Sequence, residues 1–167
     1  MSLWLAYPVI TLLAILQTSL VPQVSLGAAR PQLVMTWIVC WAVVRGRGEA
    51  MSWAIFGGLL LDLLSQMPPG AHLLAMVAVT FLADLGHRVM QGSTALFALA
   101  AIFAASLAYG TILLVVLEVT GHSVQLADTV ILNLLPGAVF NLAVLVPIFL
   151  VQRVLDQRFP VSVLPEW

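Results

Sequence analysis

The chain contains no lysine and few charged residues of any kind. Asp, Glu, Lys and Arg together make up 8% of its 167 residues, whereas soluble domains carry about 25%. A surface with so little charge cannot stay dissolved in water, so the composition excludes an ordinary soluble domain. The net charge is −1 and like charges form no block, which excludes nucleic acid as a partner.

Cysteine occurs once, as Cys40, which excludes an internal disulfide and any cysteine-based metal cluster. The three histidines are too scattered to predict a metal site. An aspartyl protease needs two carboxylates at hydrogen-bonding range, but Asp62 and Asp84 are predicted near opposite faces of the membrane. We find no phosphate-binding loop either. The sequence therefore predicts no catalytic residues, no cofactor and no metal.

Hydrophobic residues make up 62% of the chain, and its mean hydropathy is +1.12. Pro, Gly and charged residues divide it into six apolar segments, near residues 3–21, 31–44, 50–66, 71–86, 93–118 and 127–152. The first segment lacks the basic start of a secretory signal and is interpreted as a retained helix. We therefore predict an all-α integral membrane protein, a single polytopic domain over residues 1–167 with six transmembrane helices.

The six arginines predict the orientation of these spans. Cytoplasmic loops of membrane proteins are enriched in Lys and Arg. With six spans and both termini in the cytoplasm, only Arg30 lies outside, and the other five arginines all lie inside. Removing one early span would place Arg45 and Arg47 on the side opposite to Arg153 and Arg158. The arginine pattern thus favours six spans.

Asp62 lies within the apolar run of residues 56–64, where an unpaired carboxylate would be costly. Arg30 is predicted at a similar depth near the outer face and is its candidate partner. An ion pair that locks a helical hairpin is favoured over a ligand-binding role, and it predicts that swapping the two charges partly restores function. Small and polar residues share one helical face with Asp62, where another helix of this chain or of a partner can approach closely: Ala54, Gly58 and Ser65.

Further polar residues occur in the other segments. Asn133, Gly137 and Asn141 form one stripe in the last segment, and Gln17 lies near the outer end of the first. Amides at such positions favour hydrogen bonds between helices, and contact with a ligand or a partner helix is the alternative.

Several of these residues occur in an order that resembles the rod shape-determining protein MreD family of bacteria. The resemblance is carried by Leu16-Gln17, Arg30-Pro31-Gln32-Leu33, the run from Gly58 to Leu64 that includes Asp62, and Pro69-Gly70-Ala71-His72. It is firm over residues 16–90, and the later segments resemble the family in hydropathy. The structural or partner-binding candidates are Gln17, Arg30, Pro31, Ala54, Gly58, Asp62, Ser65, Asn133, Gly137 and Asn141.

The resemblance implies a non-enzymatic scaffold of the bacterial inner (cytoplasmic) membrane. Such a protein would bind MreC, belong with MreB, RodA and a class B penicillin-binding transpeptidase to the cell-elongation complex, and help to organise peptidoglycan synthesis and cell shape. The family is also similar in architecture to the six-helix substrate-binding subunits of energy-coupling-factor transporters. The alternative is therefore a vitamin-binding membrane subunit, which would use a cavity near the outer face.

Overall fold

The computed structural model describes residues 3–19, 31–45, 47–89, 94–121 and 130–158. These residues form six α-helices and one π-helical turn: α1 (Leu3–Ser19), α3 (Leu33–Arg45), α4 (Arg47–Leu64), α5 (Ala71–Val89), α6 (Thr94–Val119), η1 (Val130–Leu134) and α8 (Leu135–Arg158). The predicted all-helical fold with six helices is confirmed. The largest difference is in the last segment, where the π-helical turn precedes α8 and the helix continues to Arg158.

Two glycines mark helix ends. Gly70 has a φ of 91° and lies between Pro68-Pro69 and α5, so the chain reverses direction between α4 and α5 within a few residues. Gly121 has a φ of 86°, and its N–H donates to the Glu118 carbonyl where α6 ends. A side chain at either position would be strained because L-residues rarely adopt a positive φ.

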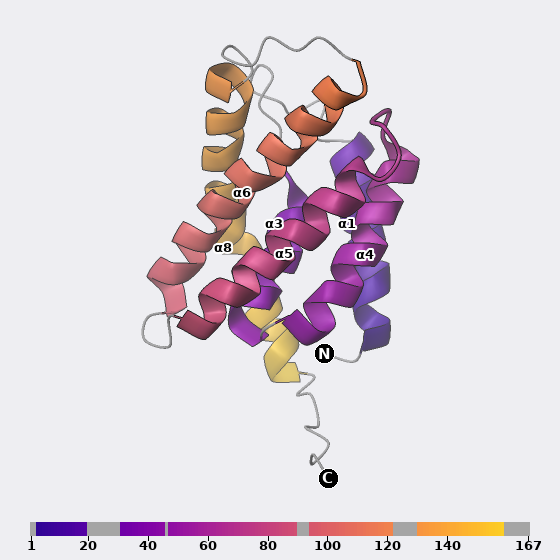
Figure 1. The fold of residues 1–167 in the computed structure, drawn as a ribbon. Coiled ribbons are helices and arrows are strands. Elements are labelled where there is room, and N and C mark those ends of the chain that lie inside the picture. The colour runs from indigo at the N-terminus through magenta and orange to yellow at the C-terminus, as the bar shows by residue number, and fades with distance from the viewer. Residues whose placement is uncertain (1–2, 20–30, 46, 90–93, 122–129, 159–167) are drawn as a thin grey trace.

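Helix α3 is the centre of the bundle. Every residue from Val34 to Val43 is at most 3% exposed, and α3 contacts α1, α4, α5, α6 and α8. Figure 1 shows α3 behind α5, with α1 and α4 on one side and α6 and α8 on the other. Burial on every face, together with these contacts, places α3 in the middle of the bundle.

The outer helices expose apolar side chains and bury polar ones. Leu63, Val119 and Val139 are 83%, 81% and 60% exposed, whereas Asn141 and Gln152 are 1% and 4% exposed. Two stretches are long and apolar enough to cross a membrane, Leu99–Val119 and Leu135–Gln152, and three shorter apolar stretches lie in α1, α3 and α5. An apolar exterior around polar contacts is the arrangement expected in lipid.

Candidate functional site

The Asp62 carboxylate binds the first backbone N–H groups of α5. Its Oδ1 accepts the N–H of His72 at 2.8 Å, and its Oδ2 accepts those of Gly70 and Leu73, both at 3.1 Å. The first turn of a helix leaves its N–H groups without partners inside the helix, and a carboxylate there also interacts favourably with the helix dipole. Asp62 thus caps a neighbouring helix, and its charge is compensated by backbone groups.

The stripe that contains Asp62 packs against α5 of the same chain. Ala54 and Gly58 are buried. A Cβ placed on Gly58 would lie 2.6 Å from the Leu73 Cα, so α4 and α5 cross with almost no space between their backbones. Ser65 Oγ accepts the Met67 N–H at 3.3 Å in the following turn. At Gly58 and Asp62, the helix in contact with this stripe is α5 of the same chain.

Arg30 lies outside the described residues, so the predicted pair with Asp62 is not among the contacts that the structure describes. Its neighbour Pro31 lies just before α3 and lines a cavity described below. In the described structure, three backbone N–H groups donate to the Asp62 carboxylate. The sequence pattern of side chains does not reveal backbone donors.

The start of α3 is held by two amide side chains from other helices. Gln17 Oε1 on α1 accepts the Val34 N–H at 3.0 Å. Asn141 Oδ1 on α8 accepts the Gln32 N–H at 2.7 Å, and Asn141 Nδ2 donates to Ser106 Oγ on α6 at 3.0 Å. Both amides therefore join helices, and Asn141 links α3, α6 and α8 at one point.

The rest of the amide stripe has different surroundings. Asn133 lies in η1, and its buried Oδ1 has no hydrogen-bond partner among the described residues, while Gly137 is buried in α8. Gln152, which the sequence reasoning did not select, donates through Nε2 to the Trp37 carbonyl at 2.8 Å. The signal for Gln152 in the sequence was an amide placed directly after an apolar run.

A histidine and a tyrosine join α5 to α6. His72 Nδ1 and Tyr109 Oη are 2.6 Å apart, and the two rings stack with centroids separated by 6.0 Å. Tyr109 is 1% exposed and His72 is 8% exposed. The sequence reasoning missed this pair, although a tyrosine in an apolar helix needs a partner for its hydroxyl. The backbone N–H of His72 also donates to Asp62. His72 therefore connects α4, α5 and α6.

These contacts surround a cavity of about 570 Å³ at one end of the bundle. The cavity lies where α1 and α4 end and where α3 and α5 begin, and Tyr109 and Leu113 from the second half of α6 also line it. Its described lining residues are neutral apart from the titratable His72: Gln17, Thr18, Pro31, Gln32, Leu61, Leu64, Ser65, Gln66, Met67, His72, Tyr109 and Leu113. The volume falls in the range of about 300–1,000 Å³ that is typical of binding pockets.

The cavity offers hydrogen bonds and apolar contacts. The described residues contain no group of three or more His, Cys, Asp or Glu side chains that could hold a metal ion. Within the described part of the chain, the hydrogen bond of His72 Nδ1 goes to Tyr109, and that of Ser65 Oγ goes to Met67. The amide, hydroxyl and imidazole groups of the lining can donate and accept hydrogen bonds. The lining can therefore contact a ligand through hydrogen bonds and apolar surfaces.

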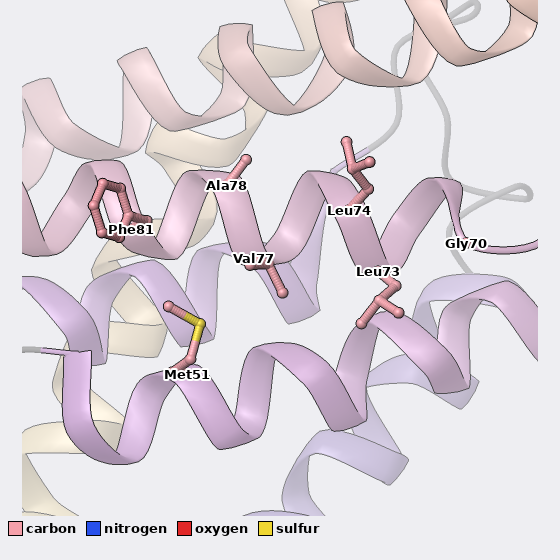
Figure 2. A pocket seen from close by; sticks show the side chains of 7 residues that line it. All are labelled: Met51, Gly70, Leu73, Leu74, Val77, Ala78 and Phe81. Carbon is pink, nitrogen blue, oxygen red and sulfur yellow. The ribbon is translucent and has the colours of Figure 1, made fainter.

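A second, apolar pocket lies on the surface between α4 and α5. Figure 2 shows the side chains along α5 with Met51 of α4 facing them. Its volume is about 580 Å³, and it is lined by Met51, Gly70, Leu73, Leu74, Val77, Ala78 and Phe81. Leu74 and Phe81 are 56% and 48% exposed. This surface has the character of the lipid-facing exterior, and the side chains that line it are all apolar.

Comparison with known proteins identifies the chain by its family. No curated protein and no solved structure gave a significant match. The model of one family, the rod shape-determining protein MreD, matches residues 1–157 of the 167. This is a structural, shape-determining family that is not known for catalysis. The family and the two long apolar helices together indicate a membrane protein. The chain therefore belongs to the rod shape-determining protein MreD family, which implies a role in rod shape determination.

Proposed function

We propose that this protein is a non-enzymatic scaffold that binds MreC and helps to organise peptidoglycan synthesis during cell elongation. It would cross the bacterial inner membrane six times and belong to a complex with RodA, a class B penicillin-binding transpeptidase and MreB. The observation that carries the proposal is the neutral cavity of about 570 Å³ at one end of the bundle. Family membership supports the shape-determining role.

The arginine pattern supports an outer-side position for this cavity. Helix α3 ends at Arg45, α4 begins at Arg47 and α8 ends at Arg158, and these positions belong to the end of the bundle where α1 begins. The cavity is formed at the other end, where α1 and α4 end. The enrichment of arginine in cytoplasmic loops makes the arginine-rich end cytoplasmic. The cavity then opens toward the compartment where MreC has its scaffold domain.

A segment of MreC next to the membrane is a suitable occupant. The described walls of the cavity present amides, hydroxyls and an imidazole among leucines and Met67, without a carboxylate or a guanidinium. Such walls match the neutral peptide groups and apolar side chains of an extended segment. Gly58 and Asp62 of the stripe contact α5, so the cavity is the better candidate for partner recognition.

Photo-crosslinking in cells tests this proposal. A photoreactive amino acid at Gln66, which is exposed on the cavity wall, should form crosslinks to MreC. The matched control is Val146, which is 59% exposed on α8 away from the cavity and should crosslink to lipid or to nothing. Equal MreC crosslinking from both positions, or none from Gln66 in a protein that expresses well, would contradict the proposal.

The cavity volume also supports a second function, the binding of a vitamin-sized molecule as in the substrate-binding subunits of energy-coupling-factor transporters. The two functions differ in what remains with the purified protein. Mass spectrometry of protein purified without MreC should find no stoichiometric small molecule if the scaffold function is correct. A cofactor-like compound that is retained at one equivalent would favour transport.

A further inference from the structure

Gln32 differs from the other glutamines of the cavity because its side-chain oxygen is buried and has no hydrogen-bond partner among the described residues. Its backbone is fully engaged, because the N–H donates to Asn141 Oδ1 at 2.7 Å and the carbonyl accepts from Thr36. The backbone bonds fix the position of the residue and leave the carboxamide oxygen unpaired.

The other glutamines of the cavity are already satisfied. Gln17 Oε1 accepts the Val34 N–H at 3.0 Å, and Gln66 is exposed, so water can bond it. A buried amide without a partner is unfavourable, and such groups are rare in native structures unless a ligand or water completes them. An occupant of the cavity could therefore donate the missing hydrogen bond to Gln32 Oε1.

We propose that Gln32 is a partner-binding residue of the cavity and that its carboxamide pairs with a peptide group of the bound segment. This inference rests on the proposed function, because it assigns one contact with the MreC segment to this residue. A glutamine side chain offers one acceptor and two donor hydrogens, which complement the N–H and the C=O of a peptide group. The side chain can turn toward the cavity without breaking a bond to any described residue.

The test compares Gln32→Met with the control Val146→Met in the full-length chain, because Val146 is exposed on α8 and does not line the cavity. Methionine keeps the length of the glutamine side chain and removes both of its hydrogen-bonding groups. Loss of this amide pair should weaken MreC binding about tenfold, whereas Val146→Met, outside the cavity, should leave the affinity within about twofold of the wild type. Affinity can be measured by microscale thermophoresis with purified MreC in lipid nanodiscs.

Thermal stability separates recognition from a structural role. Replacing an unpaired buried amide with an apolar side chain of similar shape is neutral or stabilising, so the melting temperature of Gln32→Met should equal or exceed that of the wild type. Weak binding together with a lower melting temperature would overturn the inference, because the residue would then act through the fold. Wild-type affinity in Gln32→Met would also overturn it.

The outcomes also separate this inference from the proposed function. If the wild type binds MreC and Gln32→Met binds equally well, the scaffold function stands and the role of Gln32 is wrong. If the wild type shows no affinity for MreC, the proposed function fails first and the inference fails with it. A small molecule retained by the wild type and lost from Gln32→Met would likewise overturn the peptide pairing, since the carboxamide would then recognise a different ligand.

Discussion

Replacing Asp62 with alanine removes the acceptor of three backbone N–H groups at the start of α5. Loss of a helix cap costs about 0.5–2 kcal/mol, and hydrogen bonds to a charged group are stronger than neutral ones. We expect Asp62→Ala to lower the free energy of unfolding by about 2–3 kcal/mol. Asp62→Asn retains one acceptor oxygen and should lose less. Chemical unfolding in detergent micelles measures both, with Glu118→Gln at the exposed end of α6 as the control.

The charge swap between positions 30 and 62 distinguishes capping from the ion pair predicted by the sequence. An arginine side chain has donors and no acceptor, so after Asp62→Arg the N–H groups of Gly70, His72 and Leu73 would lose their acceptor. We therefore expect the double variant Arg30→Asp, Asp62→Arg to be as unstable as Asp62→Ala. Substantial recovery in the swapped protein would show that attraction to Arg30 outweighs the cap.

A carboxylate in an apolar run indicated that Asp62 needs a partner. The sequence does not show that this partner is a set of backbone N–H groups. The three N–H groups reach the carboxylate because Gly70 adopts a positive φ and reverses the chain before α5. That geometry depends on a turn of a few residues. The His72–Tyr109 bond was missed for a related reason, because the two residues are 37 positions apart and meet only after α5 packs on α6.

At the level of the helices, Gly58 determines how closely α4 approaches α5. A Cβ at this position would lie 2.6 Å from the Leu73 Cα and 3.0 Å from the Leu73 N, and backbone atoms cannot turn aside. Gly58→Ala should therefore force the two helices apart and lower the free energy of unfolding by about 1–3 kcal/mol. The shift should also weaken the bonds of Asp62, which lies one turn further along α4.

Two other glycines of α4 provide matched controls for that substitution. At Gly57 a Cβ would meet only side-chain ends, the nearest being Val34 Cγ1 at 2.9 Å, and at Gly48 it would meet nothing within 4 Å. Thermal unfolding should rank Gly58→Ala as the least stable, Gly57→Ala as intermediate and Gly48→Ala as equal to the wild type or better, since alanine favours helix. A Gly58→Ala protein as stable as Gly48→Ala would mean that α4 and α5 are not in close contact.

Hydropathy and the positions of Pro and Gly predicted the six helices, because long apolar segments and helix-breaking residues are local properties of the sequence. The short segment at 31–44 was correctly located as α3, but its central position follows from burial on every face and was not predicted. The π-helical turn before α8 was also missed. Nothing in the residues Val130–Leu134 distinguishes a π-helical turn from an ordinary helical turn.

At the scale of the whole molecule, polar side chains connect the helices where the hydrophobic effect cannot. Lipid and leucine are equally apolar, so helices in a bilayer associate through close packing and hydrogen bonds. Asn141 joins three helices, Asp62 and His72 join three, and Gln152 joins α8 to α3. The cavity lies among these connections, and its walls therefore depend on contacts from α1, α3, α4, α5 and α6.

The proposed orientation of the molecule predicts which hairpins water-soluble reagents can reach from outside the cell. Gly48 is exposed near the start of α4, at the arginine-rich end, and Thr120 is exposed after α6, at the cavity end. In a chain with Cys40 replaced by alanine, Thr120→Cys should react with a membrane-impermeant maleimide in intact cells. Gly48→Cys should react only after the membrane is permeabilised, because arginine-rich loops remain in the cytoplasm. The reverse labelling pattern would place the cavity on the cytoplasmic side, where a segment of MreC outside the membrane could not reach it.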